Sequence, residues 1–338
     1  MSAKMINPTR DALASQAGYL IGVAARAPSV HNTQPWRFTV SQDAIELYAD
    51  PRRQLLVDPD GREMLVSCGA ALYGLRLAVR SLGYLPDVEL LPEVELLPEP
   101  GTPRRPLARV RLGLAAPITA DERKMLAAVI RRHTHRGSFE PGPLPAGLLS
   151  RLQDDVRDEG ATLIVIDSER ALRELAAIVA AAGRRQDHDP RSRAELQEWS
   201  HDASSPSRDG VPAHAFPATA AAAAGPLPQR DFDLGRGIGL LTPDGPVAPV
   251  TLALFSAGDG ELERLQAGQA LHRLLLHAAS TWVFARLNTQ PLEDVATRAL
   301  LKDRLIGTGA LQMLLQLGLS RTAHATSRRP VADLFGPC

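Results

Sequence analysis

The stretch Ala27-Pro28-Ser29-Val30-His31-Asn32-Thr33-Gln34-Pro35-Trp36 joins two apolar runs through a group of polar side chains. Before it, residues 19–26 have the apolar spacing of an amphipathic helix, and after it residues 36–40 alternate as a strand does. The pattern predicts a polar turn at a helix-to-strand junction. Binding groups collect on such turns because a rigid scaffold holds them in place.

Three side chains of this turn, Ser29, Asn32 and Gln34, donate and accept hydrogen bonds without carrying a fixed charge. Such a set suits a flat ligand that is rich in nitrogen and oxygen atoms. Ordinary turns and helix caps use the same residue types, however. The residues alone therefore leave a ligand-binding turn and a purely structural turn as equal alternatives.

The size and charge of the chain exclude several classes of protein. It has 338 residues and a formal net charge of +0, enough for one large or two moderate domains. The neutral balance argues against a general binder of nucleic acid or of membrane surfaces. Cys68 and Cys338 cannot build a disulfide framework, and no Cys/His set has the spacing of a zinc site.

The N-terminus leads into polar residues without the apolar region of a signal peptide. No apolar run approaches the roughly 20 residues that a membrane-spanning helix needs. These features predict a soluble, cytoplasmic protein without a membrane partner.

Apolar periodicity and breaker residues predict the secondary structure in outline. Residues 148–160 read as a turn region, and residues 202–249 show no periodicity. The hexapeptide Val-Glu-Leu-Leu-Pro-Glu occurs at 88–93 and again at 94–99, where its proline limits it to an edge strand or a loop. We expect helices at 8–26, 63–82, 119–132, 168–185, 193–201, 262–285 and 291–305, a hairpin at 36–49, and strands at 108–114, 161–166, 250–255 and 311–317.

The two longest expected helices share a sequence pattern. An offset of 199 residues pairs Gly69 with Gly268 and also aligns Ala71, Leu72, Leu75, Leu77 and Ser81 with identical residues. Amphipathic core helices match by chance often enough that unrelated helices remain an alternative. The shared pattern favours a chain made of two related halves.

A second polar cluster, Arg131-Arg132-His133-Thr134-His135-Arg136-Gly137-Ser138-Phe139, follows the helix expected at 119–132. Guanidinium groups bind phosphate through two parallel hydrogen bonds, and a threonine hydroxyl adds a donor. The cluster therefore indicates a polyanion site. The alternative is a basic helix end that balances the helix dipole.

Both clusters resemble motifs of the nitroreductase superfamily, whose members bind FMN. The first matches the A-P-S-x-x-N-x-Q-P-W segment of that family, and the resemblance implies that Pro28, Ser29, Asn32 and Gln34 lie along the flavin.

The second cluster resembles R-R-S-x-R-x-F, which implies that Arg131, Arg132, Thr134 and Arg136 hold the phosphate and ribityl chain. Thr134 replaces the serine, and one extra residue precedes Phe139. The role of Arg136 is therefore less well defined than that of Arg132.

In a typical family member both motifs belong to one short subunit, and the FMN site forms between two subunits. Here the first half has one motif and the second half has the other. The resemblance, to the fused Acg-like branch of the superfamily, implies an α+β fold with two half-units, 1–117 and 118–338, each a mixed sheet flanked by helices. The two would form an intramolecular pseudo-dimer, monomeric as a chain, with a further dimer left open.

Two more segments match the family. Gln290, Pro291 and Leu292 correspond to a loop that passes beside the flavin ring, although Asp294 stands where a glycine is common. Arg328 and Arg329 lie in the tail, where relatives place a phosphate-binding basic residue. A surface loop and a solvated tail are the alternatives.

The resemblance implies an NAD(P)H-dependent oxidoreductase that reduces nitro or quinone-type small molecules through FMN, with no catalytic side chain and no metal. The alternative is a flavoprotein that sequesters FMN under a lid, for which residues 202–249 are the candidate segment. Flavin-fragmenting chemistry is a third alternative. Gly235, Gly237 and Gly239 follow no strand, so they do not predict a dinucleotide-binding loop.

Overall fold

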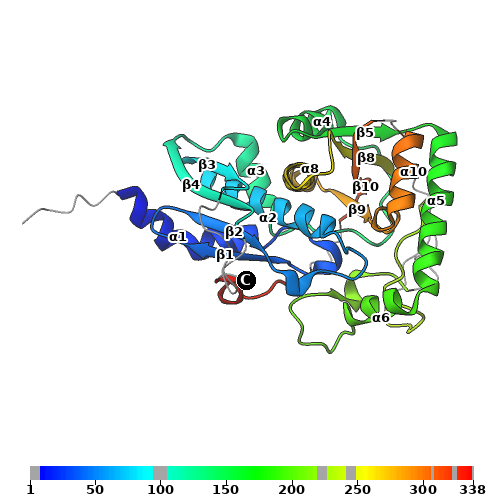
Figure 1. Cartoon of the computed structure of the whole chain (residues 1–338). Helices are drawn as coiled ribbons and strands as arrows, with labels where there is room; N and C mark the ends of the chain where they lie inside the picture. The colour runs from blue at the N-terminus through cyan, green and yellow to red at the C-terminus, as the bar shows by residue number, and fades with distance from the viewer. Residues whose placement is uncertain are drawn as a thin grey trace, which may run out of the picture.

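The computed structural model describes residues 8–93, 105–218, 227–240, 249–305, 308–321 and 326–336. Two four-stranded antiparallel sheets lie on either side of two long central helices (Figure 1). The first sheet has the order β1-β2-β4-β3 and the second the order β5-β8-β10-β9. The strands are β1 (Trp36–Val40), β2 (Ile45–Ala49), β3 (Tyr84–Leu90), β4 (Ala108–Ala115), β5 (Thr162–Ile166), β8 (Val250–Ser256), β9 (Val283–Asn288) and β10 (Ala310–Leu319).

The two sheets have the same topology. Helix α2 (Arg62–Ser81) connects β2 to β3, and helix α8 (Glu261–Ser280) connects β8 to β9, the strands at equivalent positions of the second sheet. Parallel neighbours occur at an edge strand of each sheet, as isolated bridges between Phe38 and Phe335 and between Thr134 and Ala285. The α+β fold with two related half-units that form a pseudo-dimer is confirmed.

The central helices cross at a pair of glycines. A Cβ atom added to Gly69 would lie 2.2 Å from the carbonyl oxygen of Leu265, and one added to Gly268 would lie 2.1 Å from that of Val66. The offset of 199 that pairs the two glycines also pairs Val66 with Leu265. The contact is therefore the same in both directions, as at a two-fold axis between identical subunits. Glycine is required here because the two backbones touch.

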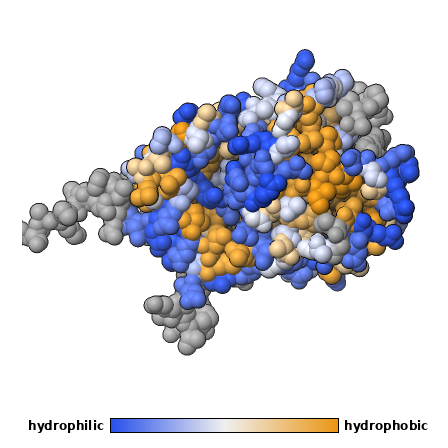
Figure 2. Space-filling view, turned by 90° about the horizontal axis from the view of Figure 1, so that it is seen from above, coloured by the Kyte–Doolittle hydropathy of each residue, from blue (hydrophilic) through white to orange (hydrophobic). Residues whose placement is uncertain are grey.

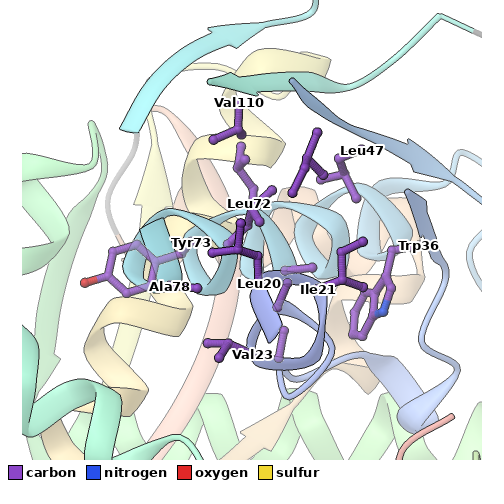
Figure 3. Close-up of a cluster of buried hydrophobic side chains, with 14 of the residues drawn as sticks. Leu20, Ile21, Val23, Trp36, Leu47, Leu72, Tyr73, Ala78 and Val110 are labelled. Carbon is purple, nitrogen blue, oxygen red and sulfur yellow. The ribbon is translucent and has the colours of Figure 1, made fainter. Parts of the chain in front are cut away.

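The side of helix α2 that faces away from α8 packs into the core of the first half. Leu72 and other apolar residues of α2 pack against α1 (Pro8–Ala24) and the inner faces of β1, β2 and β4, through Leu20, Trp36, Leu47 and Val110 (Figure 3). The alternation predicted for the hairpin is confirmed, since Trp36, Phe38, Ile45 and Leu47 are fully buried.

The second half carries the remaining helices. Capping side chains start several of them: Thr119 forms a full capping box with Glu122, Ser168 caps α5, and Asp189 caps α6. Met125 of α3 packs into the core of the first half. The helices are α3 (Ala120–Ala128), α4 (Leu148–Asp158), α5 (Glu169–His188), α6 (Pro190–Glu198), α9 (Gln290–Glu293) and α10 (Val295–Leu305).

Three predictions of secondary structure were wrong. Most of the region expected as a turn at 148–160 forms helix α4 (Leu148–Asp158), because Leu148, Leu152 and Val156 give one buried helical face. The helix expected at 262–285 ends at Ser280, and β9 begins at Val283. The helix expected at 291–305 is two helices, because the Asp294 side chain starts α10 as a cap.

The segment without periodicity has short elements and a small core of its own. It includes β7 (Val211–Pro212), which pairs with β6 (Ser200–His201) just before the segment, and the 3-10 turn Ala213–Ala215. Phe216 and Phe232 stack with ring centroids 5.9 Å apart in a buried cluster. The second copy of the hexapeptide lies outside the described residues, whereas the first begins in β3, at the edge of its sheet.

The upper face of the molecule has hydrophilic side chains across its middle and hydrophobic ones on both sides (Figure 2). The most exposed large apolar side chains of the described residues come from separate elements, among them Leu114 in β4 and Ile130 after α3. Single exposed apolar residues of this kind are normal. The described part of the chain has no helix with the length and apolar content to span a bilayer.

Candidate functional site

The turn between α1 and β1 is strained. His31, Asn32 and Gln34 have φ angles of 46°, 57° and 51°, in the left-handed region that non-glycine residues rarely adopt. The Gln34 backbone N–H donates to Ser29 Oγ over 2.9 Å, which helps to hold the conformation. Strained backbone of this type persists where the surrounding structure determines it, and it clusters at ligand sites.

The two amide side chains of the turn hold other segments. Asn32 Nδ2 donates to the carbonyl oxygens of Gly210, over 3.0 Å, and of Ser327, over 3.1 Å. Gln34 Nε2 donates to the Arg208 carbonyl over 2.9 Å, and Gln34 Oε1 accepts from the Arg329 backbone N–H over 2.8 Å. The turn thus fixes both the C-terminal tail and the segment around residues 208–210.

A pocket lies between the two halves, with the strained turn on one side. Pro28 and Ser29 line it, and Asn32 and Gln34 lie outside its lining. From the second half come Thr134, Arg136 and Gln290 of the predicted site. The rest of the lining is Val30, His31, Arg62, Glu63, Val66, Ser67, Ala70, Arg230, Phe232, Leu271, Leu287, Asn288, Thr289, Gln312 and Met313.

Arg132 is a buried cation with free hydrogen-bond donors. It is 5% exposed, and its Nη2 donates to the Arg26 carbonyl over 3.3 Å. Its Nε and Nη1 have no partner among the described residues. Burial, together with the charge of Arg26, lowers the pKa of Arg132 to about 10. A buried guanidinium is costly unless an anion pairs with it.

Arg136 lies at the pocket, with its guanidinium carbon 5.1 Å from the ring centre of Phe232. Burial, with the charges of Arg132 and Arg230, lowers its pKa to about 10. Burial and the charges of Arg132, Arg26 and Arg136 also lower the pKa of Arg328. Within the described residues no ion pair joins Arg132, Arg136 or Arg328 to a carboxylate, so positive charge accumulates beside the pocket.

Two other arginines of the predicted site lie at helix ends. Arg131 donates from Nε to the Ala279 carbonyl over 3.0 Å and from Nη2 to the Ser280 carbonyl over 3.3 Å, at the C-terminus of α8. Arg328 donates to the carbonyls of Ala25 and Ala27 over 3.1 and 3.2 Å, just after α1. A cation at a helix C-terminus stabilises the helix.

The loop after β9 has two residues at the pocket, Thr289 and Gln290. Gln290 lines it and donates from Nε2 to Gln186 Oε1 over 3.1 Å. Pro291 and Leu292 are buried outside the lining, and Leu292 belongs to the core against β10. Asp294 accepts from the Thr297 backbone N–H over 2.7 Å, which explains why it stands at this position.

Most of the pocket lining escaped the sequence prediction, including five residues with charged or aromatic side chains. Arg62 and Glu63 occupy the first turn of α2, where a pair of charged residues before a long apolar run was the available signal. Arg230 and Phe232 come from the segment without periodicity, and no pattern identifies them. His31 lies inside the quoted turn, with its ring centre 5.5 Å from that of Phe232.

The glycine-rich stretch after Phe232 is a turn organised by a carboxylate. Asp233 accepts hydrogen bonds from the backbone N–H groups of Gly237, Ile238 and Gly239 over 2.8 to 2.9 Å. Those donors are therefore already occupied by the protein itself.

Two relatives carry the name "Putative NAD(P)H nitroreductase", both from Mycobacterium tuberculosis (strain ATCC 25618 / H37Rv). The first, Rv3131, is 35% identical over 306 residues, which cover 88% of this chain and 83% of the relative. The chain belongs to the nitroreductase family. The second, acg, is 29% identical over 321 residues, which cover 93% of this nitroreductase-family chain and 93% of the relative.

No protein-family model matches this nitroreductase-family chain. A crystal structure of a nitroreductase with bound FMN from Desulfitobacterium hafniense DCB-2 aligns with a TM-score of 0.38 at 14% identity, covering 62% of this chain and 95% of that one. The family expected from the two motifs is thus confirmed by the mycobacterial relatives.

Proposed function

We propose that this chain is an FMN-dependent NAD(P)H oxidoreductase that reduces nitro or quinone-type small molecules. The observation that carries the proposal is the buried positive charge of Arg136, which lines the pocket beside the strained turn, and of its neighbour Arg132, which lies outside the lining and has two donors unpartnered within the described residues. Two half-units, 1–117 and 118–338, would contribute one motif each to a single site.

The phosphate would bind at Arg132, Arg136 and Thr134. The free Nε and Nη1 donors of Arg132 fit a phosphate, because buried guanidinium groups bind phosphate oxygens in pairs. Arg131 and Arg328 already donate to helix carbonyls, so they would support the site by fixing α8 and the tail. Arg329 would act in the same way through its hydrogen bond to Gln34.

The ring system would be held by Pro28 and Ser29 of the turn and by Asn288 and Gln290 of the second half, all of which line the pocket. Ser29 Oγ accepts from the backbone, which leaves its hydroxyl proton free to donate into the pocket. Asn32 and Gln34 would keep the turn in its strained form by holding the tail and the segment at 208–210. When bound, the flavin supplies the two-electron chemistry, and the protein supplies binding, orientation and electrostatics.

One feature favours the alternative, an FMN-sequestering protein with little turnover. Phe232 and Arg230 reach the pocket from the segment 202–249, and Arg230 forms an ion pair with Glu293. If this segment covers the flavin, nicotinamide cannot approach it. We propose that the segment acts as a lid and that the Arg230–Glu293 pair is its latch.

The test is the visible spectrum of the purified protein under anaerobic NADPH. We expect a flavin spectrum that bleaches within the mixing time of a stopped-flow experiment. Bleaching by dithionite but not by NADPH would contradict the oxidoreductase and favour sequestration, and Phe232→Ala should then restore bleaching by NADPH.

The site itself is tested with a matched pair of variants. Arg132→Met should lose bound flavin, because two free donors and a buried charge are removed. Arg170→Met, which removes an exposed arginine of α5, should retain it. Equal flavin content in the two purified variants would refute the phosphate site.

A further inference from the structure

Glu63 is a buried carboxyl group at the pocket that the proposed function does not use. It lies in the first turn of α2, is 4% exposed and lines the pocket. Neither Oε1 nor Oε2 has a hydrogen-bond partner among the described residues. Buried carboxylates normally accept several hydrogen bonds, so an unpartnered one needs an explanation.

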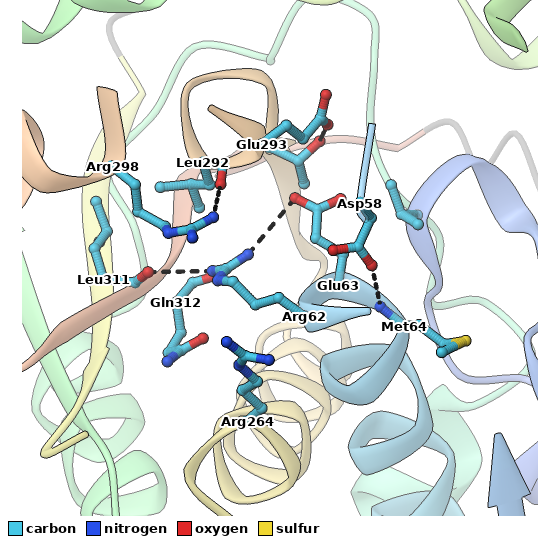
Figure 4. Close-up of polar contacts among 12 residues, drawn as sticks. Asp58, Arg62, Glu63, Met64, Arg264, Leu292, Glu293, Arg298, Leu311 and Gln312 are labelled. Atoms are coloured by element: carbon cyan, nitrogen blue, oxygen red, sulfur yellow. Dashed lines mark hydrogen bonds and ion pairs between the residues drawn. The ribbon is translucent and has the colours of Figure 1, made fainter. Parts of the chain in front are cut away.

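The charged groups around Glu63 are of both signs (Figure 4). Arg62 Nη1 is 3.7 Å from Glu63 Oε1, too far for a hydrogen bond, and its Nη2 donates to the carbonyls of Leu311 and Gln312. Glu293 and Asp58 are the neighbouring carboxylates, and Arg230 is the second cation.

Burial and the surrounding charges together favour the protonated, neutral form of Glu63. Burial, and after it the charge of Glu293, raises the pKa of Glu63 well above its usual value, and this outweighs Arg62. The Glu293 charge is itself held in place by Arg230. A carboxyl group kept protonated by burial and by a neighbouring negative charge can donate a hydrogen bond or a proton at neutral pH.

We propose that Glu63 is the proton donor of the reductive step, delivering its proton to an oxygen of a quinone-type acceptor in the pocket. The acceptor rests on the proposed function above. Reduction of a quinone to a hydroquinone takes two electrons and two protons. A hydride equivalent that originates from NAD(P)H brings both electrons and one proton. The second proton comes from the Glu63 O–H bond, which breaks as an O–H bond forms on the hydroquinone, and the Glu63 carboxylate regains a proton from water.

The protonation state is measured without turnover, by infrared difference spectroscopy of the apoprotein at pH 7. Wild type minus Glu63→Gln should contain the carbonyl stretch of a protonated carboxyl group. The control is Glu195→Gln, which removes another buried carboxyl group whose pKa burial also raises, but which accepts from the backbone N–H of Leu56 and lies outside the pocket. Persistence of the whole protonated-carboxyl signal in Glu63→Gln would overturn the proposal.

Proton delivery is measured with two acceptors. 1,4-Naphthoquinone needs a proton, whereas ferricyanide takes an electron alone. Glu63→Gln should lower kcat/KM for naphthoquinone by about 100-fold, the usual scale of general acid catalysis, and leave ferricyanide reduction unchanged. In wild type, kcat/KM for naphthoquinone should fall as pH rises through the raised pKa of Glu63, and this limb should be absent in Glu63→Gln.

Each contrary result has a distinct meaning. An equal loss with both acceptors would show a structural role and overturn proton donation by Glu63. A loss of kcat/KM for naphthoquinone in Glu195→Gln as large as in Glu63→Gln would also overturn proton donation by Glu63. A wild-type protein that reduces neither acceptor would refute the proposed oxidoreductase and proton delivery with it, while the infrared result would still decide whether Glu63 is protonated.

Discussion

The crossing of α2 and α8 makes a sharp prediction for Gly268→Ala. In a helix interior this substitution normally stabilises by about 1 kcal/mol, because alanine has the higher helix propensity. Here the new Cβ would lie 2.1 Å from the Val66 carbonyl oxygen and 2.8 Å from the Gly69 Cα. An ordinary contact begins at 3.4 Å, so the helices would have to separate by about 1.3 Å.

The opposing atoms belong to a helix backbone and cannot rotate away. Overpacking typically costs about 1–3 kcal/mol, and rigid partners place this case at the upper end. After the gain in propensity we expect a net loss of about 2 kcal/mol in the free energy of unfolding. Urea unfolding followed by circular dichroism measures it.

The matched control is Gly18→Ala in α1, where an added Cβ meets no atom within 4 Å. It should stabilise the protein by up to about 1 kcal/mol. A Gly268→Ala protein as stable as wild type would refute the reasoning, because the two halves could then not be in backbone contact at this point.

Three further predictions concern charged side chains. Arg131→Met removes two hydrogen bonds to the C-terminus of α8 and should destabilise the protein by about 1–2 kcal/mol in urea unfolding. The affinity for FMN, measured by calorimetry, should stay unchanged. A loss of FMN affinity in this variant would instead indicate that Arg131 contacts the phosphate. Asp294→Ala removes the cap of α10 and should cost about 1 kcal/mol, whereas Asp294→Asn, which retains an acceptor, should cost less; equal losses would speak against capping. Because the pKa of Glu63 is raised on folding, the native state binds its proton more tightly, so stability should fall as pH rises above the unfolded value of 4.5, by up to about 1.4 kcal/mol per pH unit until the raised pKa is passed. Glu63→Gln should lack this contribution, which unfolding at a series of pH values would reveal.

The paired central helices could be predicted from the sequence, but the end of the second could not. In the first half Gly83 follows α2 with φ 85°, and glycine is the usual signal for a helix end. The equivalent residue 199 positions later is Trp282, which adopts φ 62°. Arg131 lies over its ring, 5.4 Å from the centroid. Contacts formed only in the folded protein thus replace the glycine signal, which is why β9 was read as helix.

The pocket was predictable only where its residues are contiguous. Ser29 and Thr134 belong to motifs that a single stretch of sequence displays. Glu63 comes from α2, whereas Arg230 and Phe232 come from the segment 202–249, and they meet only because that segment folds back onto the pocket. The charged pair of Arg62 and Glu63 is visible in the sequence, but the burial that makes Glu63 notable follows only from the folded structure.

The crossing of α2 and α8 within one polypeptide changes how the pocket is assembled. Between separate subunits such a pocket forms by association and is lost by mass action on dilution. A covalent connection replaces that bimolecular step by a first-order one, with an effective local concentration on the order of millimolar. The pocket should therefore be complete in a single molecule at any abundance. Each half is also free to change without altering a symmetry-related copy of itself.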